Sequence, residues 1–255
     1  MGRKLKKYAV LNNKGGVGKS TIAVHLAHGL ARKGFKVLLI DMDGQNDASL
    51  FLGFTSEDYK NSLCDLFEKD KKVTLPECII AARENLDLLP SRHIDRVNEK
   101  LYGETCIKNV LAEKLAGLRE MGYEFAIVDC GPQRSRVNDA VLYYADGIIV
   151  PVQVETASVR AIGNIYEYIS DLGLDSGMIS LVIPNMFDQR TSDSRENLDF
   201  LKNFFMGMNI LTEPVLRRVK ITQAGKLGKT VYEYDEEASL QFSSIVERLV
   251  NMDGG

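Results

Sequence analysis

A short glycine- and lysine-rich stretch has the residue types and spacing needed to hold phosphate groups. It reads Lys14-Gly-Gly-Val-Gly-Lys-Ser20 and follows an apolar run. Its glycines are Gly15, Gly16 and Gly18. Backbone N–H groups converge on phosphate oxygens only where side chains leave room, which glycines allow. Lys19 would reach the β- and γ-phosphates of a nucleotide, and the Ser20 hydroxyl would bind Mg²⁺. The spacing therefore predicts a phosphate-binding loop between a strand and a helix.

The head of this loop departs from the general pattern, which has a glycine where this chain has Asn13, followed by Lys14. With that lysine the stretch resembles the deviant Walker A motif of the ParA/MinD family of partition and positioning ATPases. The resemblance implies that Lys14 crosses a dimer interface to the partner's nucleotide; the alternative is an exposed loop lysine. It also implies a set of nucleotide-binding residues: Lys14, Gly15, Gly16, Val17, Gly18, Lys19, Ser20 and Thr21.

Two carboxylate motifs follow apolar runs that are typical of strands. Asp41-Met-Asp-Gly-Gln-Asn46 resembles the family's Asp-x-Asp-Pro-Gln switch, with Gly44 in place of the proline. By that resemblance Asp43 positions the attacking water, so that Lys14, Lys19 and Asp43 are the expected catalytic residues. Asp129 resembles the Walker B aspartate that holds Mg²⁺ through water, with Asp41 assisting. The alternative is that these aspartates simply end strands.

The resemblance covers nearly the whole chain and extends to a candidate base-binding residue. It continues through residues 145–155, 183–191 and 222–235 and is weakest in the middle section. Asn185 stands where relatives contact adenine, although a buried strand-end amide bonded to the backbone is the competing interpretation. Gly225 replaces a proline that usually lies over the base. Mg²⁺ and ATP are the expected cofactors.

Basic residues near the carboxyl third of the chain match a DNA-binding pair in small partition ATPases. Arg190 and Lys220 stand at those positions. The resemblance implies that an ATP-bound homodimer binds duplex DNA without sequence preference through them. The alternative is a solvated basic loop. It also implies slow hydrolysis stimulated by a ParB-like or other cargo adaptor protein.

Composition sets limits on these expectations. The 255 residues carry a formal net charge of −3 and a pI near 5.8, so any contact with nucleic acid must use a local patch. No stretch approaches the roughly 18 apolar residues of a membrane span. The four cysteines have no Cys-x-x-Cys spacing, which favours free thiols over a zinc site. We expect a cytoplasmic, nucleoid-associated protein with no stable membrane anchor.

Alternating apolar patterns predict a single α/β domain over residues 1–255 with no separate DNA-binding domain. Ile22, Leu26 and Leu30 repeat at helical spacing, and a glycine at position 34 can end that helix. Residues 36–41 are apolar on both faces, as in a central parallel strand. The strand–helix alternation predicts a P-loop NTPase with a mostly parallel twisted sheet and helices on both faces. Further strands are expected at 78–81, 86–90, 125–129, 147–152, 178–183 and near 210, and helices at 62–67, 107–119, 156–171 and 194–205.

Two other classes share this loop and must be weighed. A membrane-associated MinD-like positioning ATPase would need a basic amphipathic helix after the core. Here Phe242, Ile245, Val246 and Leu249 instead favour a last core helix. An iron–sulfur reductase of the nitrogenase iron-protein type would need cluster cysteines, and Cys130 directly after Asp129 does not match that family. We therefore expect an ATP-dependent dimerising ATPase that partitions plasmid, chromosome or other cargo.

Overall fold

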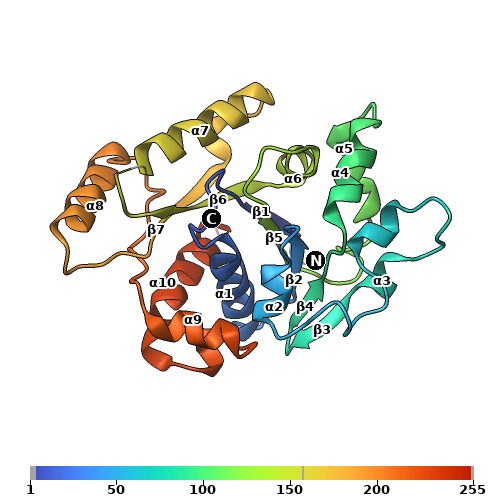
Figure 1. The fold of residues 1–255 in the computed structure, drawn as a ribbon, viewed down its shortest axis with the longest axis horizontal. Helices are drawn as coiled ribbons and strands as arrows, with labels where there is room; N and C mark the ends of the chain where they lie inside the picture. Colours follow the sequence, from blue (N-terminus) through green and yellow to red (C-terminus); the bar gives the residue numbers. More distant parts are fainter. Residues whose placement is uncertain (1–3, 157, 254–255) are drawn as a thin grey trace.

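A seven-stranded sheet forms the centre of the molecule in the computed structural model, which describes residues 4–156 and 158–253 (Figure 1). The strand order is β3-β4-β2-β5-β1-β6-β7, and all neighbours are parallel except β3 and β4. The strands are β1 (Lys6–Val10), β2 (Val37–Met42), β3 (Ile80–Arg83), β4 (Leu86–Leu89), β5 (Phe125–Cys130), β6 (Gly147–Gln153) and β7 (Ile179–Asn185).

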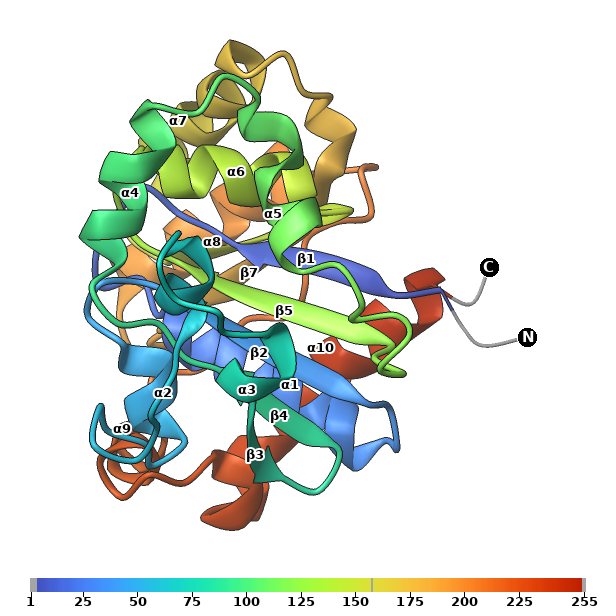
Figure 2. The ribbon, with the colours of Figure 1, turned by 90° about the vertical axis from the view of Figure 1, so that its right-hand side faces the viewer.

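Helices cover both faces of this sheet, as Figures 1 and 2 show. One face carries α1 (Lys19–Arg32), α2 (Asp47–Phe51), α9 (Val219–Lys226), η3 (Val231–Glu233) and α10 (Glu236–Asp253). The other carries η1 (Leu63–Phe67), α3 (Leu75–Cys78), α4 (Ile94–Tyr102), α5 (Ile107–Lys114), α6 (Arg136–Tyr144) and α7 (Ser158–Asp171). The short η2 (Ser176–Met178) precedes β7, and α8 (Ser192–Phe204) lies at the β7 edge.

Strand side chains alternate between two hydrophobic layers because successive residues of a strand point to opposite faces. In β2, Leu38 and Ile40 enter the layer beneath α4–α7, whereas Leu39 enters the layer beneath α1 and α10. The same period places Asp41 and Asp129, which are register partners in β2 and β5, on the α1 side. Both aspartates therefore face the helix that begins at the phosphate loop.

The loops with candidate chemistry gather at one edge of the sheet. Strand β1 lies between β5 and β6, and β2 lies beside β5. The segments that follow β1, β2, β5 and β7 leave from the carboxyl ends of parallel strands, where ligands of such sheets bind. The expected α/β P-loop architecture is confirmed.

Several boundaries differ from the expectation. The helix predicted over 107–119 ends at Lys114 and continues as turns, and the strand predicted at 78–81 begins only at Ile80. The segment near Ile210 forms isolated bridges instead of a regular strand, from Leu211 to Val182 of β7 and from Leu216 to Phe187 just after β7. A run of hydrogen bonds, including Val215 N–H to the Pro184 carbonyl at 2.8 Å, still holds it along β7.

The last helix is a core element, as predicted. In α10, Phe242, Ile245, Val246 and Leu249 are buried in the layer shared with α1. This arrangement removes the amphipathic face that a MinD-like membrane helix would need. Among the described residues, none of the helices is long and apolar enough to cross a membrane.

Candidate functional site

The phosphate loop connects β1 to α1, and its backbone geometry requires glycine at two positions. Gly16 and Gly18 have φ angles of 74° and 89°, which L side chains rarely adopt. A Cβ on Gly18 would also lie 2.3 Å from the Asn185 amide nitrogen. At Gly15 an added Cβ would meet no protein atom, so only a bound ligand could require glycine there.

Asn12, which sequence analysis did not identify, ties this loop to the neighbouring strand. Its buried amide donates to the Pro151 carbonyl at 2.7 Å, and its Oδ1 accepts from the Lys14 backbone N–H at 2.9 Å. The loop therefore starts from a fixed point on β6. In the sequence, Asn12 is an amide residue between an apolar run and the glycines. A single sequence does not distinguish such a residue from an ordinary loop residue.

The two lysines of the loop have different surroundings. Lys19 is buried, and its Nζ donates to the Lys14 carbonyl at 3.4 Å across the loop. Lys14 is partly exposed and forms an ion pair with Glu155, which follows β6. Thus Lys19 points into its own loop, whereas the Lys14 ammonium lies at the rim against a carboxylate of the same chain.

Asp129 provides the clearest sign of a cation site. Its carboxylate is fully buried, and neither oxygen has a hydrogen-bond partner in the described protein. Burial raises the pKa of Asp129 well above its usual range, the charges of Asp41 and Asp43 raise it further, and the Ser20 hydroxyl and the Lys19 charge lower it. A buried carboxylate beside a serine hydroxyl is a donor set that suits Mg²⁺. These residues therefore fit the predicted metal.

Asp41 organises the loop after β2. Its carboxylate accepts hydrogen bonds from the backbone N–H and hydroxyl of Ser49 at 3.0 and 2.6 Å, and from Asp43 N–H at 3.2 Å. Burial raises the pKa of Asp41 to about 6, although these hydrogen bonds lower it. With its oxygens already used in this way, Asp41 would act on a metal through water. Ser49, on α2, was not identified from the sequence.

Asp43 lies where the loops after β2 and β5 meet. Its Oδ1 accepts from Gln45 N–H at 3.1 Å, and an added Cβ on Gly131 would be 3.7 Å from that oxygen. Asp43 and Gly131 line one cavity of about 250 Å³. On its far side, the Asn138 amide donates to the Gly131 and Gln133 carbonyls at 2.9 and 2.7 Å. Asn138 therefore fixes the loop that contains Gly131.

A second cavity opens beside the phosphate loop. It has a volume of about 510 Å³ and includes Thr21, Asn185 and Gly225 in its lining. Asn185 is buried, donates to the Val17 carbonyl at 2.8 Å and accepts from Met186 N–H at 2.9 Å. It therefore satisfies the backbone and also lines the cavity, so both interpretations of this amide remain compatible with its position. Phe51 of α2 contacts Gly225, where an added Cβ would be 3.0 Å from the ring.

The two candidate DNA-binding residues come from the segment after β7 and from α9. Arg190 follows β7, is 82% exposed at its side chain, and pairs with Asp188 in its own loop at 2.6 Å. Lys220 is on α9, with its Nζ 5.5 Å from the centre of the Tyr234 ring. The segment before α9 is joined to that before α8 by the Arg217 N–H, which donates to the Phe187 carbonyl at 2.9 Å.

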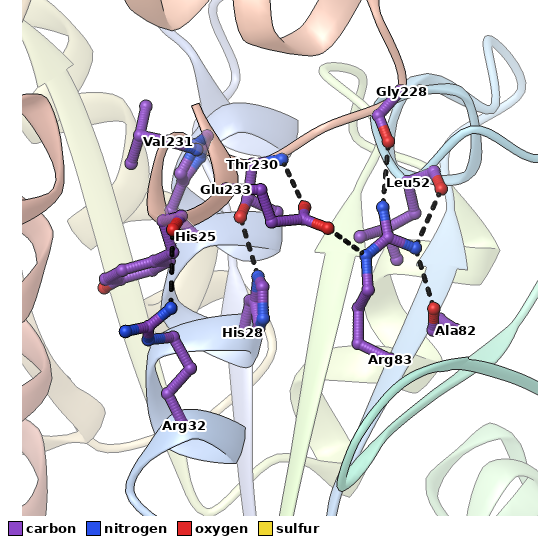
Figure 3. A network of polar contacts seen from close by, with 11 residues as sticks. His25, His28, Arg32, Leu52, Ala82, Arg83, Gly228, Thr230, Val231 and Glu233 are labelled. Carbon is purple, nitrogen blue, oxygen red and sulfur yellow. Dashed lines mark hydrogen bonds and ion pairs between the residues drawn. The ribbon is translucent and has the colours of Figure 1, made fainter. Parts of the chain in front are cut away.

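A network of polar contacts anchors α1 to the segment before α10 (Figure 3). The Val231 N–H donates to His25 Nε2 at 3.0 Å, so the Nδ1–H of His25 donates to the Thr21 carbonyl at 2.6 Å. His28 Nδ1 lies 2.7 Å from the Thr230 hydroxyl. Both histidines are buried.

The network continues to the β3 edge. The Thr230 N–H donates to Glu233 at 2.8 Å, and Glu233 pairs with Arg83 at 2.7 Å. The Arg83 guanidinium donates to the Leu52 and Gly228 carbonyls at 3.3 and 2.9 Å. Arg83 therefore joins the residue after α2 to the loop after α9. Residues of α2 and α9 line the larger cavity.

Substitution of His28 should reduce the dependence of stability on pH. Burial lowers the pKa of His28 from 6.5 to about 4. The unfolded chain therefore binds the additional proton between these values, so the free energy of unfolding falls as pH falls from 6.5 towards 4. Between pH 7.5 and pH 5.0 the His28 contribution amounts to about 2 kcal/mol. Urea unfolding should show that His28→Gln loses less stability over this interval by about that amount. Equal losses in both proteins would contradict the buried neutral histidine.

The cysteines do not form a cluster site in the described residues. Cys64, Cys78 and Cys130 are buried free thiols and Cys106 is exposed, whereas the sequence predicts only buried or partly buried thiols. Cys130 packs in the hydrophobic layer of the face opposite α1. Burial there raises the pKa of its thiol. This position disfavours an iron–sulfur reductase.

Comparison with known proteins agrees with this geometry. The AAA domain family matches residues 5–176. The chain is 28% identical over 235 residues to the sporulation initiation inhibitor protein Soj of Bacillus subtilis, with 90% of this chain and 91% of Soj covered. It is 29% identical over 236 residues to the chromosome partitioning protein ParA of Caulobacter vibrioides, covering 91% and 88%.

Among solved structures, an ATP complex of a McdA variant from Cyanothece superposes with a TM-score of 0.83 at 26% identity, covering 98% of each chain. The family match spans more than half of the chain, and the strand order and phosphate loop agree with it. The chain belongs to the AAA domain family and is a P-loop ATPase of the ParA/MinD type.

Proposed function

We propose that this protein is an ATP-dependent dimerising switch that binds duplex DNA in its ATP-bound state and positions a cargo. The observation that carries the proposal is the placement of the two loop lysines. Lys19 is buried within its own phosphate loop, whereas Lys14 is at the rim, paired only with a carboxylate that it can leave. A lysine placed in this way can neutralise a nucleotide bound to a second subunit.

The residues divide the work of hydrolysis among them. Lys19 and the loop N–H groups would bind the phosphates of ATP, and Ser20 with Asp129 would hold Mg²⁺. The metal would supply charge neutralisation between the phosphates when bound. Asp43, at the meeting point of the β2 and β5 loops, would orient the attacking water. On dimerisation Lys14 would exchange Glu155 for the partner's nucleotide.

The larger cavity is suited to the nucleoside part of ATP. It lies directly beside Thr21, at the start of α1, and its lining includes the apolar side chains of Phe51, Leu216, Val219 and Ile221. Aromatic and aliphatic walls with a few polar groups are typical of base-binding cavities. We infer that Asn185 contacts adenine there while keeping its bond to the loop backbone.

We call the basic residues that would contact DNA, Arg190, Arg218 and Lys220, the basic rim. Its positive charge is partly neutralised by carboxylates of the same chain. Arg190 pairs with Asp188, and Arg218 pairs with Glu237 at 2.8 Å. DNA phosphates would therefore have to compete with nearby carboxylates for these guanidinium groups. Such competition favours weak single contacts, which a dimer strengthens by presenting two copies of the rim.

Charge changes on this rim should alter DNA affinity in opposite directions. Arg190→Ala or Lys220→Ala should weaken binding of the ATP-bound protein to arbitrary duplex DNA without affecting dimerisation. Each lost phosphate contact reduces the log–log salt slope by about 0.9, so a dimer that loses one contact per subunit should lose roughly 1.8. Asp188→Asn should strengthen binding, because it frees Arg190 and removes a negative charge.

Fluorescence anisotropy with a labelled random-sequence duplex, at several salt concentrations and with ATP or ADP, measures these changes. Lys33→Ala is a matched control, since this lysine at the end of α1 pairs with Glu247 away from the strand carboxyl ends. Wild-type affinity and salt slope in both Arg190→Ala and Lys220→Ala would exclude this rim as the DNA contact.

The relatives indicate the kind of process but not the cargo. Soj and ParA are named for sporulation control and chromosome partitioning. We propose that this chain likewise works with a ParB-like or other adaptor protein that stimulates its ATPase activity, and that its DNA contacts place it on the nucleoid.

A further inference from the structure

The end of α8 and the turn that follows it expose four large apolar side chains close together in sequence. Phe200, Phe204, Met206 and Met208 are 44%, 43%, 74% and 53% exposed. Phe200 and Phe204 lie one helical turn apart, and their rings stack with centroids 6.2 Å apart. In Figure 1 this helix forms the outer edge of the molecule beyond β7. We call these four residues the α8 apolar surface.

The fold does not need these side chains for its own packing. Leu198 and Leu201 of α8 and the following Phe205 are buried and attach the helix to the sheet. Phe204 contacts Phe205 edge to face, with ring centroids 4.8 Å apart, but 43% of Phe204 remains exposed. A contiguous exposed apolar patch of this kind is typical of an interaction site.

The backbone beneath the surface is held in one conformation. Gly207 lies between the two methionines and Asn209 directly follows Met208. Their positive φ angles of 83° and 49° turn the chain sharply there. Arg248 of α10 donates to the Asn209 carbonyl at 2.7 Å and to its side-chain oxygen at 3.1 Å. Because the turn is tied to α10, a partner would meet a preorganised surface, which reduces the entropic cost of binding.

Carboxylates flank the aromatic pair. Glu196 precedes Phe200 by four residues and so lies on the same stripe of α8, and Asp193 and Asp199 are exposed on the adjoining positions. In the described part of the chain, Glu196 and Asp199 form no ion pair. The basic residues of this helix lie elsewhere: Arg195 donates to the Gln189 carbonyl at 2.9 Å, and Lys202 lies two residues from each phenylalanine.

We infer that the α8 apolar surface docks a partner protein through an amphipathic segment that carries apolar and basic side chains. Apolar side chains would cover Phe200 and Phe204, and lysine or arginine would face Glu196 and Asp199. The same carboxylates oppose an anionic membrane, which would be repelled from this face. Naming the partner as a cargo adaptor rests on the proposed function, whereas the docking chemistry does not.

The position of the surface makes this contact independent of nucleotide. Helix α8 begins after the carboxyl end of β7, at the nucleotide edge, and its 13 residues run about 20 Å away from it. The apolar surface therefore lies on the part of α8, and the turn after it, that leads away from the nucleotide edge. A partner bound there would leave the dimer face and the DNA contact open.

A pair of synthetic peptides tests this chemistry on the full chain without ATP or DNA. One fluorescein-labelled 16-residue peptide places leucines at helical i, i+3, i+4 spacing with lysines elsewhere, and its match carries glutamates in place of the lysines. Fluorescence anisotropy should show the basic peptide binding at least tenfold more tightly than the acidic one. Phe200→Ser with Phe204→Ser should weaken basic-peptide binding at least tenfold, and Glu196→Lys with Asp199→Lys should abolish the preference for it.

The matched control is Leu240→Ser, because Leu240 is 63% exposed on α10 and lies outside this surface. Circular dichroism and ATP affinity should be unchanged in every variant. Equal binding of both peptides, or wild-type binding by the double phenylalanine variant, would overturn the proposal. Two further outcomes would overturn it. If the protein self-associates without nucleotide and the double phenylalanine variant does not, the occupant is a second copy of the chain. If the protein floats with phosphatidylcholine vesicles and that variant does not, the occupant is a lipid surface. None of these outcomes bears on ATP-dependent dimerisation or DNA binding, which are tested by separate experiments.

Discussion

Asp43→Ala should bind ATP normally and lose nearly all turnover. Orientation of a reacting group contributes several powers of ten in rate, and Asp43 lies where the loops after β2 and β5 meet. The phosphate-binding groups lie in the loop between β1 and α1 and at the start of α1, so they are untouched by this change. The expected result is a rate of phosphate release reduced at least about a thousandfold with an ATP dissociation constant within a few-fold of wild type.

A phosphate-release assay beside calorimetry with Mg-ATP separates the two quantities. Asp95→Ala is the matched control, because Asp95 lines the same cavity but comes from α4 and not from the loops after β2 and β5. Normal turnover in Asp43→Ala would show that another group orients the water. Lost ATP affinity would show instead that Asp43 maintains the loop structure through its bond with Gln45.

The second large effect is expected at Lys19. Lys19→Ala removes a buried ammonium from a site that would hold the charged β- and γ-phosphates. A charge-assisted hydrogen bond contributes about 2 to 3 kcal/mol, which corresponds to roughly a 30- to 150-fold loss of affinity. The dissociation constant for ATP should therefore rise by this factor, and productive binding should fail at ATP concentrations that just saturate the wild-type protein.

Calorimetry with Mg-ATP measures this loss directly. Lys33→Ala serves as the comparison, because that lysine at the end of α1 pairs with Glu247 away from the strand carboxyl ends. An unchanged dissociation constant in Lys19→Ala would mean that this loop does not bind the nucleotide.

The sequence predicts the centre of the fold because those elements carry strong local signals. Strands β2 and β5 are buried on both faces and appear as uninterrupted apolar runs. Helix α10 shows a regular apolar stripe, and the closely spaced glycines of the phosphate loop indicate a backbone with positive φ angles. Such signals do not depend on what the rest of the chain does.

The missed elements are short or are stabilised by distant residues. Helix α6 is held by capping at Ser135 and by packing against α5, and α9 buries only Ala224. They have only nine and eight residues, so few repeats of an apolar pattern are present to identify them. The helix predicted to reach position 119 ends early because turns at Gly117 and Gly122 take its place.

Site residues that act by long-range contact were also beyond the sequence. Asn12 meets Pro151, Ser49 meets Asp41, and Lys14 meets Glu155 only once the strands are aligned. For Asn185 the pattern left two interpretations open, and the structure places the amide where it serves the backbone and lines the cavity. Side-chain partners across a sheet are set by register, which single-sequence patterns do not contain.

The central claim is that Lys14 joins two ATP-bound subunits. Two nucleotides facing one another in a poorly hydrated interface would carry uncompensated negative charge without a lysine from each partner. Lys14→Gln should therefore bind ATP as a monomer, and combining it with Asp43→Ala should remove the long-lived dimer that Asp43→Ala accumulates. Glu155→Gln provides the opposite change, because it releases Lys14 from its present partner and should favour the dimer.

Size-exclusion chromatography with light scattering, in Mg-ATP, decides the claim most directly. The account predicts a dimer of about twice 28.4 kDa for Asp43→Ala and a monomer for Asp43→Ala with Lys14→Gln. A monomer for Asp43→Ala, or a dimer that persists without Lys14, would contradict it.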